Sequence, residues 1–158
     1  IGLCRKDMEL LSSYYQKEIT AMHIAVRTSL PDNPLFIDGN AEQLGKTIMS
    51  LLNNGMYAIA KKYGKKAYPA EIGLALESKD GQAVIRLYDN GVGIEQSILD
   101  KIFDPFFTTK TTGEAAGIGL YLSKEIILNH HGQIAVRSEK DELTEFTITL
   151  PLWEEKSV

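Results

Sequence analysis

The sequence contains little cysteine, no excess of basic residues and no long apolar run. Cys4 is the single cysteine among 158 residues, which excludes disulfide frameworks and cysteine-based zinc sites and fits a reducing, cytoplasmic setting. The formal net charge is −4, which gives no sign of a nucleic-acid-binding surface. No apolar run approaches the roughly 18 residues that span a bilayer, and no signal peptide is visible. We therefore expect no contact with nucleic acid or with a membrane.

The remaining composition is that of an ordinary globular domain. Apolar residues make up 44% and charged residues 24% of the chain. The length suits one domain, which we expect to occupy residues 1–158 with its core at about 7–151. The first residue is Ile1, so we expect the chain to be a piece of something longer.

The strongest secondary-structure signal is a helix at residues about 41–62, where apolar residues recur on one face. Asn40 is its expected N-cap, with Gln43 as capping partner. Further helices are expected at about 7–18, 95–101 and 117–130, the last with Gly132 just beyond its end. Strands are expected at about 22–28, 35–37, 71–77, 82–89, 133–138 and 144–150. The Lys79-Asp80-Gly81 turn predicts a hairpin, and the mixture favours a two-layer α/β sandwich with helices on one sheet face.

Asp89 is the first residue with chemical interest. It continues an alternating apolar row formed by Ala83, Ile85 and Leu87, which predicts a carboxylate against the core. Such a group needs a hydrogen-bond donor, and the exocyclic amine of adenine is one. The alternative is that Asp89 merely starts the Asp-Asn-Gly turn.

Asn54 lies off the apolar centre of the long helix. Its face also carries Ser50, Ala58 and Lys61 at helical spacing. A side-chain carbonyl at that place suits Mg²⁺, which prefers oxygen ligands and keeps waters and phosphates as the others. The alternative is an exposed polar residue on a helix flank.

Two glycine-bearing segments suggest close approach of backbone to a ligand. Gly91 and Gly93 would admit a flat group, or simply form a tight turn. The segment 117–120 starts a helix, where free N–H groups suit an anion, and Lys110 offers a charge to a terminal phosphate. The alternative is a glycine-bearing loop with a solvated lysine.

An aromatic cluster and a strand threonine complete the candidates. Phe103, Phe106 and Phe107 either anchor a mobile loop to the body or belong to the core. Thr144 opens an inward row and either meets an adenine edge or is an ordinary strand residue.

In their order along the chain, these segments resemble the catalytic ATP-binding domain of sensor histidine kinases. The matching stretches are LLNNGMYAI (51–59), DNGVGI (89–94), IFDPFFTTK (102–110), GIGLYLSKEII (117–127) and TEFTITLP (144–151). The resemblance covers about residues 7–151 and places the chain in the gyrase, heat-shock chaperone, histidine kinase and MutL superfamily. It implies a mixed, mainly antiparallel sheet of about five strands under three helices, with a mobile ATP lid at 108–116.

The resemblance also implies ATP and Mg²⁺ as ligands. Asn54 matches the Mg²⁺ ligand, and Asp89 matches the acceptor of the adenine amine. Asn54 and Lys110 are the implied catalytic residues. The implied nucleotide-binding residues are Asn54, Ala58, Lys61, Asp89, Gly91, Gly93, Ile94, Phe107, Gly117, Ile118, Gly119, Leu120 and Thr144.

The chain departs from the family pattern at several positions. A second asparagine is common where Ser50 stands, and alanine is usual where Gly55 stands, at a cost of about 1 kcal/mol in helix propensity. Ala115 and Ala116 replace a Gly-Thr pair of the second glycine box. These changes bear on phosphate affinity more than on adenine recognition.

A phosphoacceptor histidine is missing. His23 falls in a predicted strand, and His130 and His131 fall at a helix end, so we interpret all three as structural or surface residues. The chain then resembles the phosphoryl-donor half of a kinase. Its expected partners are ATP or ADP, the dimerisation and histidine phosphotransfer domain of the parent kinase, and a response regulator.

Two rival functions stay open at the level of sequence. An ATPase of the same superfamily would need a glutamate base near Asn54, but residues 50–53 include no acid. A non-catalytic nucleotide-binding signalling module is the other rival, and the alanines at positions 115 and 116 favour it slightly.

Overall fold

The computed structural model describes residues 2–3, 13, 16–21, 23–63, 69–105, 107 and 118–153. In chain order the elements are β1 (Gly2–Leu3), α2 (Gln16–Ala21), β2 (Ala25–Ser29), β3 (Leu35–Phe36), α3 (Ala41–Tyr63), β4 (Glu71–Lys79), β5 (Gln82–Asp89), the 3₁₀ helix η1 (Gln96–Ile98), α4 (Ile118–Asn129), β6 (Gln133–Glu139) and β7 (Leu143–Pro151). Over these ranges, no helix combines the length and the hydropathy that crossing a membrane requires.

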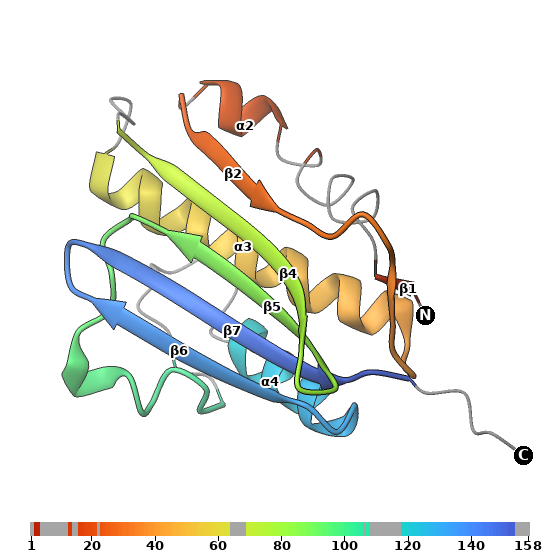
Figure 1. Cartoon of the computed structure of the whole chain (residues 1–158). Helices are drawn as coiled ribbons and strands as arrows, with labels where there is room; N and C mark the ends of the chain where they lie inside the picture. The colour runs from red at the N-terminus through yellow and green to blue at the C-terminus, as the bar shows by residue number, and fades with distance from the viewer. Residues whose placement is uncertain are drawn as a thin grey trace, which may run out of the picture.

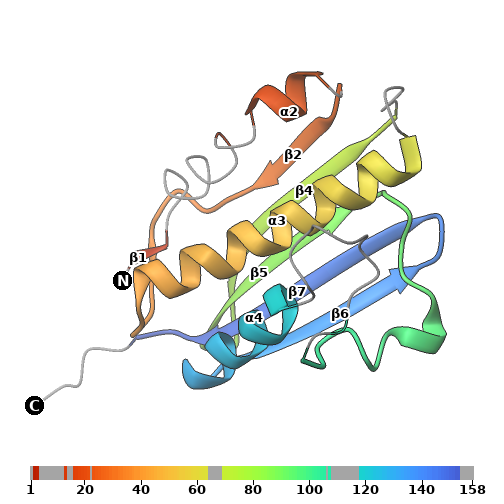
Figure 2. The same ribbon diagram turned by 180° about the vertical axis from the view of Figure 1, so that it is seen from behind.

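The main sheet has five strands in the order β2-β4-β5-β7-β6. β2 runs parallel to β4, and the other neighbours pair antiparallel. A separate short pair joins β1 to β3. Helices α3 and α4 lie across one face of the main sheet, and α2 lies beside β2 at its edge (Figures 1 and 2). The expected α+β sandwich with a mixed, mainly antiparallel five-stranded sheet and three helices is confirmed.

The core lies between α3, α4 and the inward rows of the central strands. On β5 the alternating residues Ala83, Ile85 and Leu87 are buried, as the sequence predicts. The α3 residues of the core are Leu44, Ile48, Leu51, Leu52, Met56 and Ile59. Burying each large aliphatic side chain contributes roughly 1.5–3 kcal/mol, so this stripe fixes α3 on the sheet.

The start of α3 is joined to the end of α4. The Asn40 side chain accepts from the Gln43 N–H at 2.9 Å, so the expected N-cap is confirmed. The Asn40 N–H, which the partner of a capping box would satisfy, donates instead to Nε2 of His130 at 3.0 Å. Nδ1 of His130 lies 2.7 Å from the Ile126 carbonyl. His130 is therefore a structural link between the two helices.

Helices α2 and α4 both end in a histidine with left-handed backbone. His23 has φ 53° and His131 has φ 62°. At α4 the Gly132 N–H donates to Ile127 O at 2.9 Å, the bond of a Schellman end, and α2 ends in the same way. Gly132 thus lies just beyond the helix end, as predicted, whereas the predicted start of one strand is wrong by a few residues. The strand expected at 22–28 begins at Ala25, because His23 belongs to the turn that ends α2. Gly132 lies one residue beyond the left-handed position.

The remaining element boundaries lie close to the predictions, with one exception. Asp80 and Gly81 have φ 52° and 77°, the signature of a two-residue type I′ hairpin, as predicted. The helix expected at 95–101 is reduced to the 3₁₀ turn Gln96–Ile98. Of the helix expected at 7–18, residues 7–12, 14 and 15 lie outside the described residues.

Candidate functional site

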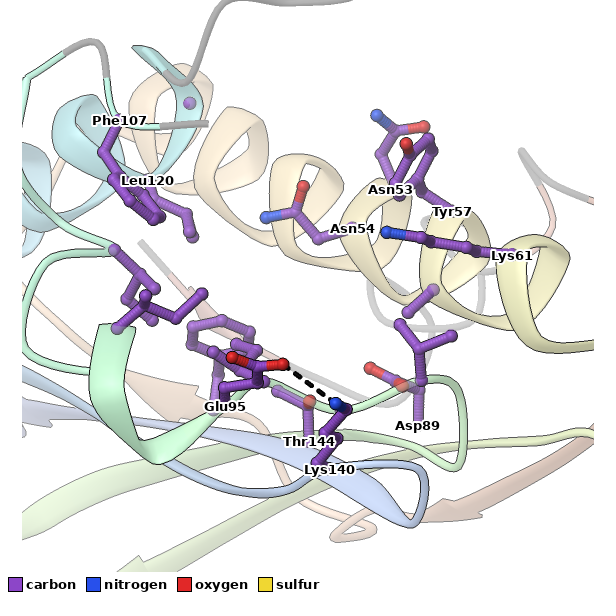
Figure 3. Close-up of a pocket in the computed structure, with 18 of the residues that line it drawn as sticks. Asn53, Asn54, Tyr57, Lys61, Asp89, Glu95, Phe107, Leu120, Lys140 and Thr144 are labelled. Atoms are coloured by element: carbon purple, nitrogen blue, oxygen red, sulfur yellow. Dashed lines mark ion pairs between the residues drawn. The ribbon is translucent and has the colours of Figure 1, made fainter. Parts of the chain in front are cut away.

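A cavity of about 520 Å³ lies between α3, the ends of β5 and β7 and the loop that follows β5 (Figure 3). Most of the residues singled out in the sequence line it: Asn54, Ala58, Lys61, Asp89, Gly93, Ile94, Phe107, Gly119, Leu120 and Thr144. They come from α3, β5, β7, the start of α4 and two loops, so the fold brings together positions separated by up to 90 residues along the chain. The volume is that of an ordinary small-molecule site.

Of the predicted residues that the structure describes, Gly91 is not part of the cavity wall, and three other predicted residues lie wholly or partly outside the described part of the chain. Gly91 lies behind the wall, where a side chain would collide with the backbone of Ala58 at 2.5 Å. Ile118 is the first residue of α4, and its side chain lies outside the described part of the chain. Lys110 and Gly117 also lie outside the described residues, as do Phe106 and the predicted lid at 108–116.

Asp89 is buried at the inner end of β5, with 6% of its surface exposed. Its Oδ1 accepts from the Gly91 N–H at 2.9 Å, so the residue does start the turn, as the plainer interpretation had it. It also lines the cavity, and its carboxylate points inward (Figure 3). Burial raises the pKa of Asp89 to about 7, against the lowering effects of the Gly91 hydrogen bond and the charge of Lys62.

The loop 90–95 is held from both sides. Val92 N–H donates to Ala58 O on α3 at 3.2 Å, and the Asn90 side chain bonds Glu71 N at 2.7 Å and Pro69 O at 2.8 Å. Lys62 donates to Asn90 O at 3.3 Å. With its backbone polar groups satisfied in this way, the loop is preorganised beside Asp89.

The β6–β7 hairpin forms the back of the cavity. Gly93 has φ 69°, and a side chain there would overlap Glu139 O, so only glycine lets the loop approach this hairpin. Asp141 N–H donates to Val92 O at 2.5 Å. An exposed ion pair between Glu95 and Lys140, with an N–O distance of 2.9 Å, crosses the rim (Figure 3).

The opposite end of the cavity lies where α4 begins. A side chain at Gly119 would lie 2.8 Å from Oγ of Ser50, so the glycine allows α4 to start close against α3. Asn54 projects from α3 between this end and Asp89 (Figure 3). The start of α4 thus lies at the end away from the buried carboxylate, and the amide group of Asn54 lies between the two.

Of the three aromatic residues, Phe103 and Phe107 pack against the core, as the plainer interpretation had it. The Phe103 ring packs edge-on against Phe146, with ring centroids 6.3 Å apart and an interplanar angle of 78°. Nζ of Lys124 lies over the same ring at 5.3 Å from its centroid. Phe103 and Phe107 are partly buried against the core, and Phe107 also lines the cavity. The segment before position 108 is therefore anchored by aromatic packing.

Sequence reasoning missed several cavity residues. Among them are Asn53, Tyr57, Val92, Glu95, Ile98, Ile102, Lys140 and Asp141. Asn53 and Tyr57 follow from helical spacing around Asn54, so that signal was available. Lys140 and Asp141 reach the cavity only because β6 and β7 pair beside β5, which no local pattern indicates.

These features define an α+β sandwich whose cavity has a buried carboxylate at one end and a helix start at the other. A family model for the histidine kinase-, DNA gyrase B- and HSP90-like ATPases matches residues 39–154. The chain therefore belongs to that family, as the ATP-binding catalytic domain of a sensor histidine kinase.

Curated relatives agree with this assignment. Sporulation kinase D of Bacillus subtilis (strain 168) is 34% identical over 78% of this chain and 22% of its own length. The signal transduction histidine-protein kinase AtoS of Escherichia coli (strain K12) is 39% identical over 77% of this chain and 19% of its own length. The chain thus spans about a fifth of the length of these relatives.

Solved structures share the fold. The catalytic domain of histidine kinase ThkA superposes with a TM-score of 0.80 at 20% identity, covering 96% of each chain. The full-length ShkA structure in complex with AMPPNP matches with a TM-score of 0.74 at 16% identity, over 96% of this chain and 30% of that one. At these identities the likeness supports the fold alone.

Proposed function

We propose that this domain binds ATP–Mg²⁺ in the cavity and donates the γ-phosphoryl group to a histidine on a separate dimerisation domain of its parent kinase. The observation that carries the proposal is the buried Asp89, whose carboxylate faces a cavity of nucleotide size. The family and the two relatives, which are named as a sporulation kinase and as a signal transduction histidine-protein kinase, support it at a coarser level.

The base end of the cavity suits adenine. One oxygen of Asp89 already accepts from Gly91 N–H, and the carboxylate still faces the cavity. An exocyclic amine would donate to it, whereas a carbonyl at the same position of guanine would be repelled. The preorganised loop 90–95 keeps backbone close to the plane of the base, which is where its glycines are needed.

The other end suits phosphates and a hard cation. Asn54 would hold Mg²⁺ through its side-chain oxygen, with phosphates and water as the remaining ligands. When bound, Mg²⁺ supplies positive charge between the phosphate groups. The first N–H groups of a helix have no partner within the helix and suit an anion, so the start of α4 would favour a phosphate group. Lys110 and Gly117 complete this end as predictions that lie outside the described residues.

Phosphoryl transfer is favoured over hydrolysis of ATP. The residues of α3 that line the cavity are Ser50, Asn53, Asn54, Tyr57, Ala58 and Lys61, and none of these described residues carries a carboxylate to activate water. We infer that the domain positions the nucleotide and neutralises charge, while the nucleophile comes from the partner domain. The proposed partners are therefore that dimerisation domain and, downstream, a response regulator.

The direct test combines binding with transfer. Asp89→Asn is expected to lose most ADP affinity in calorimetry, and with it the formation of phosphohistidine on the parent kinase's dimerisation domain. The matched control is Asp80→Asn, which makes the same charge change at an exposed turn at the other end of β5. Unchanged ADP affinity in Asp89→Asn would show that the proposed pocket is wrong. Binding without transfer by the unmodified domain would instead support the non-catalytic alternative.

A further inference from the structure

We propose that Ser138 is a positioning residue that fixes the Thr144 hydroxyl as a hydrogen-bond acceptor toward the base end of the cavity, and so helps to select an amine over a carbonyl. This inference rests on the proposed function, because it names a determinant of base choice within the same site. Ser138 itself was not singled out by the sequence, although its neighbours Ile94 and Thr144 were.

Ser138 lies at the centre of a buried hydrogen-bond cluster. Its surface is 3% exposed, and its Oγ lies 2.7 Å from Ile94 N, 2.7 Å from Leu143 O and 2.8 Å from Oγ1 of Thr144. The residue therefore joins the loop after β5 to both strands of the β6–β7 hairpin.

The direction of each bond follows from the chemistry of the groups. The Ile94 N–H only donates and the Leu143 carbonyl only accepts, so the single hydroxyl proton of Ser138 goes to Leu143. Ser138 has no second proton, so in the pair with Thr144 it must accept. The Thr144 proton is thereby committed to Ser138, and the Thr144 oxygen keeps only lone pairs for any other group.

Those lone pairs lie next to Asp89. Thr144 and Asp89 are direct partners in the antiparallel register of β5 and β7, so their side chains share one face of the sheet. Both residues line the cavity, and Thr144 is only 4% exposed. With Asp89 ionised, the two side chains present acceptors and no donor. An amine with two N–H groups matches this pair, and a carbonyl oxygen does not.

Loss of Ser138 would release this constraint. In Ser138→Ala the Thr144 hydroxyl loses its acceptor and is free to turn its proton toward a ligand carbonyl. The same change also removes the acceptor of Ile94 N–H and the hydroxyl that donates to Leu143 O, so it should weaken binding of any nucleotide. The informative quantity is therefore the ratio of two affinities, one for a nucleotide whose base carries an amine and one for a nucleotide whose base carries a carbonyl.

The experiment measures calorimetric affinities for ADP and for inosine diphosphate, whose base carries a carbonyl where adenine carries its amine. The variants are Ser138→Ala, Thr144→Val, the double variant and the control Ser78→Ala, an exposed strand serine away from the cavity. We expect the preference for ADP to narrow by roughly fivefold or more in Ser138→Ala. In the Thr144→Val background, removal of Ser138 is expected to leave the ratio unchanged, because the hydroxyl it orients is gone.

Other results overturn the inference. If Ser138→Ala lowers the affinities for ADP and for inosine diphosphate by the same factor, Ser138 has only a structural role. The same conclusion follows if the variant shifts the ratio of the two affinities equally in the wild-type and Thr144→Val backgrounds. Should the alanine variant fail to fold, Ser138→Cys replaces it, since a thiol keeps the volume but accepts hydrogen bonds poorly. A wild-type domain that binds neither nucleotide would refute the proposed function itself, which is a different outcome from an unchanged ratio.

Discussion

Folding and the proposed recognition of adenine favour opposite protonation states of the Asp89 carboxyl group. The folded protein buries the carboxyl group, which favours its protonated form, and Gly91 and Lys62 offset only part of that effect. Recognition of an adenine amine requires the ionised form, which accepts hydrogen bonds. A pKa near 7 in the protein without nucleotide is the result of these opposing contributions.

This raised pKa predicts how stability depends on pH. The folded pKa of Asp89 is about 7, above the usual 3.8, so the folded state binds more protons than the unfolded state between these values. The stability that Asp89 contributes is therefore present below about pH 4 and is lost as the pH rises through about 7. The loss is at most about 1.4 kcal/mol for each pH unit in that window.

Urea unfolding of the wild type and of Asp89→Asn at pH 5 and pH 8 measures this contribution. Asparagine does not titrate, so the variant lacks the loss of stability that the Asp89 carboxyl group causes as the pH rises. From pH 5 to pH 8, the free energy of unfolding of the variant should therefore increase relative to that of the wild type. A difference between the two proteins that stays constant, or that moves the other way, would show that the carboxyl group does not titrate with a raised pKa.

At the scale of elements, α2 and α4 lack the glycine that usually occupies the left-handed position at the end of a helix. Histidine occupies the left-handed position of both helix ends, and a left-handed backbone costs an ordinary residue roughly 1–2 kcal/mol. His131 is exposed, so its side chain contributes little packing to offset that cost.

His131→Gly should therefore stabilise the protein. We expect a gain of about 0.5–1 kcal/mol, because removal of backbone strain outweighs the extra entropy of glycine in the unfolded chain. Thermal and urea unfolding measure it. His131→Ala is the matched control, since it removes the same imidazole but keeps a Cβ, and it should bring no gain. Equal stability of the two variants would mean that the backbone at this position is not strained.

Elements whose signals are local could be predicted from the sequence. The apolar stripe of α3, the Asp80-Gly81 turn and the inward row that ends at Asp89 each depend on neighbours a few residues away, and each is found where expected. The end of α2 could not be placed, because a histidine at a left-handed position has no compositional signal comparable to glycine.

The candidate site was predictable only in part, for a related reason. Asn54 and Asp89 occupy recognisable motifs, whereas Ser138, Lys140 and Asp141 reach the site through strand pairing. β5 pairs with β7, its neighbour in the sheet but not in the sequence, and β6 lies beyond β7. Such non-local register depends on the whole fold, so the hydrogen bond from Ile94 to Ser138 has no counterpart in any local pattern.

At the scale of the whole molecule, the cavity lies where several elements meet, and other hydrogen bonds hold these elements in place. His130 joins the start of α3 to the end of α4, and Lys62 joins the end of α3 to Asn90 and Asp141. The start of α3 is thus tied to the end of α4, and the end of α3 is tied to the loop after β5 and to the β6–β7 hairpin, which both line the cavity. This arrangement places Asn54 at a fixed position relative to Asp89.

The chain covers about a fifth of the length of sporulation kinase D and of AtoS, and the proposed phosphoryl transfer involves a separate dimerisation domain. The domain alone should bind nucleotide, and the phosphoryl acceptor should come from elsewhere in the parent kinase. Binding is therefore the property of this chain that tests the account without other components.

The affinity for a non-hydrolysable ATP analogue, measured by calorimetry with and without Mg²⁺, tests the central claim most directly. The wild type should bind the analogue more tightly when Mg²⁺ is present, and Asn54→Ala should lose most of that gain while retaining part of its ADP affinity. Asn129→Ala, at an exposed position at the end of α4, should behave as the wild type. An affinity that does not respond to Mg²⁺ in the wild type, or a full response in Asn54→Ala, would contradict the account.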